Sequence, residues 1–495
     1  MKTSEVDENK WLTSKERISL VKKLNIDGQT SCMRGVLISK KRNEIKSLGI
    51  PVIEDKAKQT LVLMALEPEW EAKFEPNSYG FRIGRSTHDA VEALRLSLNK
   101  KEKYVLDANI KKCFDEINHG YLLKKLKTFP KLEKQVAAWL KAGVLDKGAQ
   151  QGGVISPLLA NIALHGMEKE TIRLTKEYKI IDVSDRSVDL STKKQNFGWV
   201  RYGDDFVFLS SSLHVVKVIK TGIEKWLRPI GFELNVDKTQ IVNSAERLND
   251  KTAGFEFLGF EIMHRLVSKY RRGKIKKPNK LFIHASKTSK SKHLRSIKNM
   301  LKKTQNVMQV VKKLNHLVKK WSNYHCTRMN SKVFQIMDYQ IRYKLFKWAK
   351  RKHKERSVRW IHKKYFRRVD GRKKFGYELQ HSWVYEIVHT DIHIKHHVKV
   401  KGEKSPYDGD WPYWGKRNER LIKRFDDNTI KFFKKQKWKC AFCQLTFKPK
   451  DIVKKDHIKT KSRGGENEIS NLQVLHGHCY ETKTQLQKAR WNEKH

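Results

Sequence analysis

The chain has 495 residues, with 106 Lys or Arg against 53 Asp or Glu, so its formal net charge is +53. Hydrophobic residues make up 38% and aromatic residues 10%, which excludes a disordered basic tail. No apolar run approaches the roughly 20 residues of a membrane span, and the polar first ten residues predict neither a secretory signal nor a transit peptide.

The positive charge is concentrated in the second half of the chain. Residues 1–262 carry 44 basic and 35 acidic side chains, whereas residues 263–495 carry 62 and 18. Within this half, residues 263–337 contain 21 Lys or Arg and no acid. A solvated protein face normally mixes both signs, so this stretch predicts a polyanionic partner, with an anionic membrane surface as the rival interpretation.

In chain order, the first half mixes short β-rich runs with helical stretches. The patterns predict a strand over 105–110, a helix over 122–142 and a β-hairpin over 199–209, with Asp204 and Asp205 at its turn. Adjacent carboxylates repel each other, and a divalent metal of the kind used in phosphoryl transfer relieves that repulsion. A surface Asp-Asp turn without any metal is the alternative.

The acid-free stretch and the residues after it contain two amphipathic helix patterns. Apolar residues recur at helical spacing over 307–324 and again over 334–348, which predicts buried helix faces. The lysines between them are expected to point outward, so we predict a small helical bundle with a basic exterior. These lysines are Lys312, Lys313, Lys319, Lys320, Lys344 and Lys347.

Three of the six cysteines lie close together near the C-terminus. Cys440 and Cys443 form a C-x2-C pair, and His476 and Cys479 form an H-x2-C pair 33 residues later. Two such pairs predict a tetrahedral structural zinc site, which would supply folding free energy to a segment too small for a large core. A disulfide scaffold and a thioredoxin-like redox pair are both disfavoured.

Seven short blocks follow one another through the first half. Their order resembles that of the reverse transcriptases encoded by group II introns, and two later segments, 314–324 and 348–353, resemble the thumb or maturase domain of that family. The seven blocks are S-L-G-I-P at 47–51, D-K-A-K-Q at 55–59, L-E-P-E-W-E-A-K-F-E-P-N-S-Y-G-F-R-I-G-R-S at 66–86, Q-G-G-V-I-S-P-L-L-A-N at 151–161, Y-G-D-D at 202–205, G-F-E-L-N-V-D-K-T at 231–239 and F-E-F-L-G-F at 255–260.

The resemblance implies an α+β chain built as a right-hand polymerase with a small zinc-bound ββα-metal domain of the HNH endonuclease type. The domains expected from it are N-terminally shortened fingers and palm at 1–262, a thumb or maturase domain that binds intron RNA at 263–385, a linker at 386–435 and an HNH-like domain at 436–495.

For the polymerase centre, the resemblance implies Mg²⁺ ions held by Asp204 and Asp205, with Phe114 as the steric gate that excludes ribonucleotides. The family's third metal-binding Asp falls on Asn109, whose neutral amide is a weak ligand for a hard cation. Asp107 shares a strand face with it but lies two residues away, about 6.6 Å of strand rise. We therefore do not expect Asp107 to replace the missing metal ligand at position 109.

For the HNH module, the resemblance implies that His457 is the general base, that Asn471 orients its imidazole and that Asp456 holds Mg²⁺. The family's final metal-binding His falls on Tyr480, a poor substitute. The zinc ligands are all present, whereas the cleavage centre is altered.

These patterns predict a group II intron protein that binds its intron RNA and assists splicing, with polymerase and nuclease activities weakened by Asn109 and Tyr480. A fully active mobile-intron enzyme is the alternative. Target DNA is a further expected partner, a membrane is not, and a homodimer is left open. The excess of Lys over Arg and the motif resemblance favour an organelle-encoded, chloroplast protein, with mitochondrial and bacterial origins as alternatives.

Overall fold

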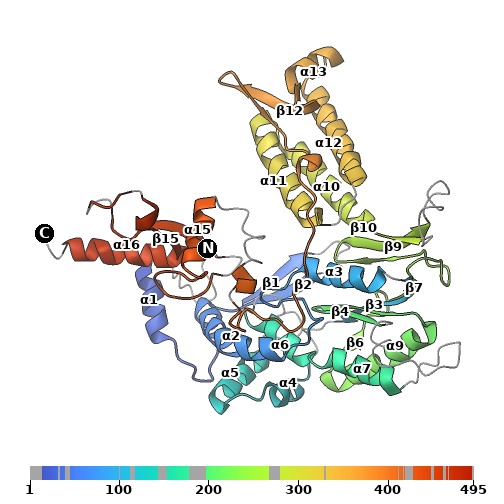
Figure 1. Ribbon diagram of the computed structural model, residues 1–495, viewed down its shortest axis with the longest axis vertical. Helices are drawn as coiled ribbons and strands as arrows, with labels where there is room; N and C mark the ends of the chain where they lie inside the picture. The colour runs from blue at the N-terminus through green and yellow to red at the C-terminus, as the bar shows by residue number, and fades with distance from the viewer. Residues whose placement is uncertain are drawn as a thin grey trace. The chain divides into compact units, whose positions relative to one another are not determined.

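Contacts within the computed structural model divide the chain into two compact units, 1–402 and 403–495, which are described separately. The elements of both units are labelled in Figure 1. Across the described residues, no helix is long and apolar enough to cross a membrane. The structure describes residues 14–31, 34–39, 45–99, 101–111, 117–142, 153–177, 197–266, 279–327, 331–410, 412–415, 417, 427–447, 451–460, 464–466 and 468–492.

The first unit begins with a helix, a hairpin and two longer helices. They are α1 (Ser14–Lys23), the antiparallel pair β1 (Arg34–Ser39) and β2 (Ile45–Ile50), α2 (Ile53–Lys73) and α3 (Thr87–Leu98). Ser86 caps α3 in a reciprocal capping box with Asp89, which satisfies backbone groups at the helix start. The two helices pack into different hydrophobic clusters, α2 through the first three and α3 through the last two of five buried residues. The five are Val62, Leu66, Trp70, Val91 and Leu94.

An antiparallel sheet forms the centre of this unit. Its strands run in the order β4 (Gly198–Tyr202), β5 (Asp205–Ser210), β3 (Tyr104–Lys111) and β6 (Glu233–Leu234), and β7 (Gln240–Asn243) also pairs with β3. The predicted strand and the predicted hairpin are both confirmed. The register places Asn109 opposite Asp205, so the hairpin turn lies beside the far end of β3.

Helices pack against the central sheet, and one prediction about them is wrong. The predicted helix over 122–142 is two helices, because Lys127 adopts a left-handed conformation with φ of 45° and Pro130 begins a new helix where its missing N–H is tolerated. The helices are α4 (His119–Leu126), α5 (Pro130–Lys141), α6 (Ser156–Ala163), α7 (Met167–Glu177) and α9 (Leu213–Leu227), which a short 3-10 turn, η1 (Arg228–Ile230), follows.

A second sheet leads from the central sheet to a helical bundle. Its antiparallel strands are β8 (Phe255–Phe257), β9 (Phe260–Leu266) and β10 (Asn279–Ala285), in the order β10-β9-β8. The backbone N–H of Ser286 donates to the carbonyl of Gly259, and the hydroxyl of Tyr324 donates to the carbonyl of Leu258. These bonds attach the first and second bundle helices to the turn between β8 and β9.

The bundle consists of α10 (Lys287–Lys303), α11 (Val307–His325), α12 (Ser331–Lys352) and α13 (Val358–Tyr365). Helices α10, α11 and α12 lie side by side in Figure 1. Both predicted apolar stripes are buried or half-buried, and five of the six predicted outward lysines are exposed, with Lys344 half-buried. The predicted bundle is therefore confirmed.

Antiparallel strands complete the bundle. They are β11 (Phe366–Val369), β12 (Arg372–Leu379) and β13 (Ser382–Tyr385), and Phe375 of β12 packs into the bundle core. Buried Glu386 follows β13 and bonds to Phe375 through both its backbone and its side chain. The strands therefore extend the bundle's apolar core.

The segment after these strands, the beginning of the predicted linker, packs against the first unit. It contains the 3-10 turn η3 (His389–Asp391), where the His389 backbone and imidazole both bond to Asp338 of α12. Further on, the backbone N–H of Val400 donates to Asp89, 2.8 Å away. Residues 386–402 are thus bound to the first unit, and only later residues belong to the second.

The second unit contains a two-stranded sheet and a long helix in the order strand, strand, helix. Its elements are α15 (Asp427–Lys435), β14 (Val453–His457), the 3-10 turn η5 (Ile469–Asn471), β15 (Leu472–His476) and α16 (Gly477–Asn492). The two strands pair antiparallel, with His457 opposite Leu472. A small core containing Phe432, Phe433 and Cys479 lies within this unit.

Candidate functional site

The turn between β4 and β5 brings the predicted carboxylates next to Asn109. The amide nitrogen of Asn109 lies 3.1 Å from an Asp204 carboxylate oxygen and 2.7 Å from an Asp205 oxygen, so one amide donates to both. The carbonyl of Asp204 also accepts from the backbone N–H of Ile110 at 2.9 Å. The predicted constellation is thus present, with an amide between the two acids.

A buried polar network fixes this turn from behind. The guanidinium of Arg201, a fully buried side chain, donates to Asn161 and to the carbonyl of Gly203, and the amide of Asn161 donates to the carbonyl of Gly80. A Cβ atom added to Gly80 would lie 2.2 Å from the nitrogen of Gly203, so only glycine fits there. The network holds the two acids in place.

Burial changes the acidity of two carboxyl groups here. Burial, and then the neighbouring Asp204, raise the pKa of Asp205, while the hydrogen bond from Asn109 opposes the rise. Burial also raises the pKa of Asp107 to about 6, despite the hydrogen bond it accepts from Gln240 at 3.0 Å. Asp107 is thus held by Gln240, while Asn109 contacts the turn.

The side chains of Asn109, Asp204 and Asp205 are poorly suited to bind two Mg²⁺ ions. A Mg²⁺ site needs oxygen ligands, and here two carboxylates face the N–H groups of an amide, which satisfy them as a cation would. If the Asn109 amide were flipped, its oxygen would face the two carboxylates, and these oxygens would repel each other. Phe114, the predicted steric gate, lies outside the described residues. The polymerase centre therefore has two of its three expected acids.

The four predicted zinc ligands come together in the second unit. One ligand atom from each of Cys440, Cys443, His476 and Cys479 lies within 4.8 Å of the others. The Nδ1 atom of His476 is 3.3 Å from the sulfur of Cys443, and the backbone N–H of His476 donates to the sulfur of Cys440. Burial and the nearby thiols raise the pKa of Cys479 to about 12, and metal binding would displace its proton.

A carboxylate orients the histidine of this cluster. The Nε2 atom of His476 lies 3.2 Å from an Asp451 oxygen, which leaves Nδ1 facing the thiols. Ligating imidazoles in proteins commonly have such a partner, which fixes the tautomer. Three thiols and one imidazole in a buried cluster fit a tetrahedral zinc ion. The residues would hold zinc as a structural ion joining the C-x2-C loop to the start of α16.

The predicted metal-binding carboxylate of the nuclease centre already has a cation. The ammonium of Lys483, on α16, donates to Asp456 and to the carbonyl of His457, and Gln473 donates to the same Asp456 oxygen at 2.8 Å. Tyr480 is partly buried and packs against the apolar core of this unit. A metal at Asp456 would have to compete with Lys483, so the residues fit a catalytic Mg²⁺ poorly.

Asn471 holds a loop through its amide. Its oxygen accepts from the backbone N–H of Lys459, and its nitrogen donates to the carbonyls of Lys459 and Glu466 at 3.0 and 2.9 Å. These bonds use both amide hydrogens, so its effect on His457 comes through the loop that follows that residue. The resemblance implies that Asn471 orients the imidazole, and these contacts give it a backbone-positioning role in the loop after His457.

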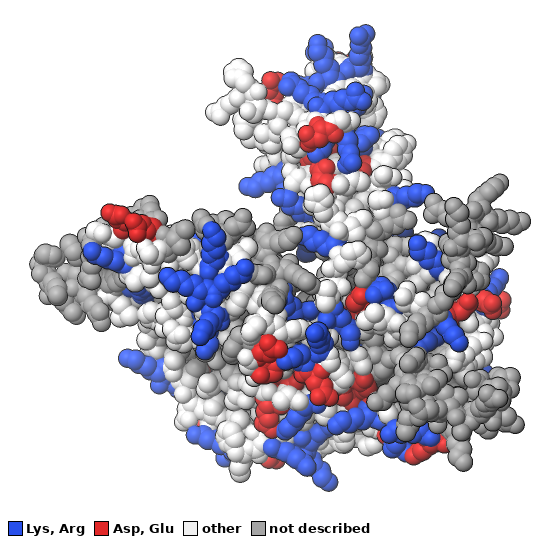
Figure 2. Space-filling model, in the orientation of Figure 1, with Lys and Arg blue, Asp and Glu red and all other residues white. Residues whose placement is uncertain are grey.

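Basic side chains gather on the bundle of the first unit. Figure 2 shows Lys and Arg over the bundle helices and the strands beyond them, with few acidic groups between. The exposed lysines of α10 and α11 include Lys302, Lys303, Lys312 and Lys319. The part of this surface formed by α10 and α11 lies within the acid-free stretch and suits a polyanion.

Sequence reasoning missed the residues that position these sites. Arg201 directly precedes the Y-G-D-D block and Asn161 ends an earlier block, and neither motif reveals the contact between these two side chains. Lys483 is one helical turn after Cys479, a spacing that could have suggested proximity. Nothing in the sequence pattern links Asp451 to His476. The two residues are 25 positions apart and belong to no common motif.

Comparison with protein families assigns three parts of the chain. Residues 38–262 match the family of reverse transcriptases described as RNA-dependent DNA polymerases. Residues 289–366 match the group II intron maturase-specific domain, and residues 440–486 match the HNH endonucleases. The three matches occur in the predicted order along the chain.

Individual relatives agree with this assignment. Protein YkfC of Escherichia coli is 32% identical over 268 residues, 48% of this chain and 68% of that protein. The group II intron-encoded protein LtrA of Lactococcus lactis is 29% identical over 303 residues, and the chain spans only about half of it, 49%. A Candida tropicalis telomerase structure matches with a TM-score of 0.35, at 17% identity over 48% of this chain and 54% of that one, too weak for any argument. The chain belongs to the group II intron reverse transcriptase and maturase family, with an HNH endonuclease domain at its C-terminal end.

Proposed function

We propose that this protein binds the RNA of its group II intron and assists splicing, and that it uses the basic bundle to do so. The maturase-specific match covers α10 to α13, the helices that carry the exposed lysines. The observation that carries the proposal is the run of 75 residues, 263–337, with 21 basic and no acidic side chains, which includes α10 and α11 and their exposed lysines. Phosphate neutralisation by such a surface supplies affinity without requiring any catalytic group.

Both chemical centres support a role other than catalysis. At the polymerase centre, the Asn109 amide takes the place of a metal-binding acid and bonds to both remaining carboxylates. At the nuclease centre, Lys483 neutralises Asp456, and Tyr480 replaces a ligand. We propose that DNA synthesis and DNA nicking are weak in this protein, while the zinc site and the palm packing maintain its shape for RNA.

The test is RNA binding by a double lysine variant. Lys312→Ala/Lys319→Ala removes two exposed cations one heptad apart on α11. The matched control, Lys217→Ala/Lys225→Ala, removes two exposed cations from α9. Each lost phosphate contact should flatten the slope of log affinity against log salt by about 0.7 for single strands.

The two variants should therefore separate clearly in a filter-binding titration with the intron RNA. We expect the slope of log affinity against log salt to be shallower by about 1.4 for the bundle variant than for the wild type. The control should keep the wild-type slope. Equal slopes for the two variants, or a larger loss in the control, would move RNA binding away from the bundle.

A fully active mobile-intron enzyme is the second candidate function. It is favoured by the proximity of Asp204 and Asp205 at a rigid turn and by the assembled zinc cluster. Such a protein would use target DNA as a partner and would bind Mg²⁺ despite the Asn109 amide. Primer extension by the wild type on an RNA template decides between the two candidates, because efficient synthesis would require a working metal centre.

We further propose an organelle-encoded protein that acts where it is made, with the chloroplast favoured by composition. The chain uses lysine far more often than arginine, as AT-rich genomes favour. Bacterial relatives support a bacterial origin equally well. Organelle fractionation followed by immunoblotting would test this, and a homodimer would be tested by the mass of the free protein in solution.

A further inference from the structure

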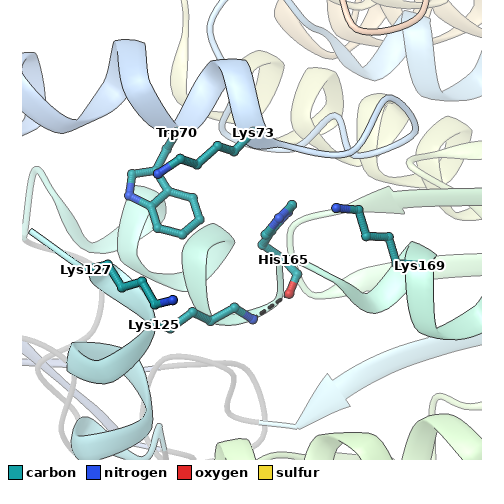
Figure 3. Close-up of a pocket in the computed structure, with 6 residues that line it drawn as sticks. All are labelled: Trp70, Lys73, Lys125, Lys127, His165 and Lys169. Atoms are coloured by element: carbon teal, nitrogen blue, oxygen red, sulfur yellow. Dashed lines mark hydrogen bonds between the residues drawn. The ribbon is translucent and has the colours of Figure 1, made fainter.

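A cavity of about 380 Å³ lies between three helices of the first unit. It is bounded by the end of α2, by α4 and the residue that ends it, and by the turn into α7. Figure 3 shows side chains from these elements directed toward one space. None of them belongs to the carboxylate turn, the zinc cluster or the basic bundle. The lining residues are Trp70, Lys73, Lys125, Lys127, His165 and Lys169.

Four of these residues are lysines, and their charges are only partly compensated. Lys73 pairs with Glu69 at the surface. Lys125 donates to the carbonyls of Ala163 and His165, and to a tyrosine hydroxyl, none of which is charged. Among the described residues, the ammonium groups of Lys127 and Lys169 have neither a hydrogen-bond nor an ion-pair partner. The cavity therefore has a net positive field.

The two remaining lining residues carry unsatisfied polar atoms. The Nε1 atom of Trp70 and the Nδ1 atom of His165 are both buried without a hydrogen-bond partner in the described part of the chain. Trp70 is 3% exposed, so bulk water does not compensate its N–H. Neither atom has surface open to the cavity, so the contacts to a ligand come from the lysines.

The acidity of two groups agrees with this positive field. Burial, and then Lys125 and Lys169, lower the pKa of His165 to about 4, so its imidazole is neutral at pH 7. Burial lowers the pKa of Lys125 to about 8, so most of its ammonium stays charged at that pH. A neutral imidazole can donate an N–H to an anion while the lysines neutralise it.

We propose that this cavity binds the phosphate of a nucleotide, either a free nucleoside monophosphate or one nucleotide of an RNA strand. The lysine ammonium groups would repel a metal cation. An apolar ligand would offer them no hydrogen-bond acceptor. A bare phosphate would fill only a small part of the space, whereas ligand pockets of about 300 to 1,000 Å³ hold molecules of nucleotide size or larger. The proposal does not depend on splicing, because it concerns a different surface from the bundle.

The test uses the full chain and two matched double variants. Lys127→Ala/Lys169→Ala removes the two unpaired cations, and Lys124→Ala/Lys176→Ala removes exposed lysines from the same helices outside the cavity. Neither pair is buried, and thermal melting of each variant confirms that it is folded. Titration calorimetry then measures the binding of AMP, inorganic phosphate and a single-stranded 12-nucleotide RNA to all three proteins.

We expect the cavity variant to lose at least about tenfold in affinity, because it lacks two lysines that make charge-assisted contacts to the phosphate. The control should stay within about twofold of the wild type. If AMP shows the loss, the ligand is a free nucleotide; if only the RNA shows it, with a salt slope smaller by about 1.4, the ligand is a nucleotide of RNA.

Three results would overturn the proposal. One is identical affinity of the cavity variant and the wild type for AMP and for RNA. Another is an equal loss in the cavity variant and in the control. The third is binding of a ten-residue polyglutamate peptide that depends on Lys127 and Lys169 while AMP and RNA do not bind, which would assign the cavity to an acidic protein segment.

Discussion

At the scale of single residues, two side chains satisfy carboxylates that are expected to bind metal ions. Asn109 donates to both carboxylates of the hairpin turn, and Lys483 donates to the carboxylate expected to hold the nuclease metal. Each satisfies an acid that a divalent cation would otherwise bind. The sequence predicted the first departure from position alone, whereas Lys483 was found only in the fold.

Replacing Asn109 with Asp should increase DNA synthesis. The substitution adds a third carboxylate and removes the amide that satisfies the other two, so Mg²⁺ would bind more tightly and the transition-state charge would be better stabilised. We expect primer extension on an RNA template to rise at least about tenfold, a gain of about 1.4 kcal/mol.

The control for this experiment is Asn109→Ala. It removes the amide without supplying an acid and should leave synthesis as low as in the wild type. Wild-type synthesis as fast as that of Asn109→Asp would contradict our interpretation of the polymerase centre.

At the nuclease centre, Tyr480→His combined with Lys483→Ala should increase nicking. The change frees Asp456 from its ammonium partner and restores an imidazole ligand. We expect an increase of at least about tenfold in nicking of supercoiled DNA that carries the intron insertion site, in the presence of Mg²⁺. Adding Asp456→Ala to the double variant should abolish the gain; nicking that persists would locate the metal elsewhere.

At the scale of secondary-structure elements, the sequence was most informative where periodicity and burial agree. The strand over 105–110, the hairpin over 199–209 and the two bundle helices follow their apolar patterns. The break inside 122–142 was missed because Pro130 starts a helix as readily as it ends one, and the left-handed Lys127 leaves no mark in the apolar pattern. The attachment of residues 386–402 depends on distant partners such as Asp89 and Asp338, which no local pattern reveals.

The zinc cluster should depend on Asp451 although that residue is outside the ligand set. Its carboxylate orients His476, and loss of such a partner typically weakens metal affinity about 10 to 100-fold. We expect Asp451→Asn to weaken zinc binding by that factor in a competition titration with a chromogenic chelator. The exposed Glu468→Gln, in the same unit, should have no effect. Equal zinc affinity in Asp451→Asn and the wild type would show that His476 needs no orienting partner.

The bundle contains a buried acid that should make its stability depend on pH. Burial raises the pKa of Glu386 from 4.5 to about 8, so the native state keeps a proton that the unfolded chain loses near pH 4.5. The free energy of unfolding should therefore fall as pH rises from about 4.5 to about 8 and level off above that.

Glu386→Gln removes the titrating group and keeps the oxygen that accepts from the Phe375 N–H. We expect this variant to be more stable than the wild type by about 1 to 3 kcal/mol at pH 9, and by much less at pH 4.5, in urea unfolding. The exposed Glu378→Gln, on β12, should show no such pH dependence. A constant difference between Glu386→Gln and the wild type across this range would mean that Glu386 does not titrate as described.

At the scale of the whole molecule, the excess positive charge lies mainly in the half proposed to bind RNA. The half with the carboxylate turn has 44 basic and 35 acidic residues, while the half with the bundle and the zinc cluster has 62 and 18. The sequence alone predicted this division, the order of the domains and the four residues of the Cys/His cluster. It could not predict the cavity between α2, α4 and α7, because its lysines come from three separate elements and only the fold brings them together.

The most direct measurement is splicing of the protein's own intron RNA at low magnesium, with and without added protein. Our account predicts that the wild type raises the splicing rate and that Asp204→Asn/Asp205→Asn raises it equally, since RNA binding needs no catalytic carboxylate. Lys312→Ala/Lys319→Ala should raise it much less. Failure of the wild type to raise the rate, or loss of the effect in the carboxylate variant, would contradict the account.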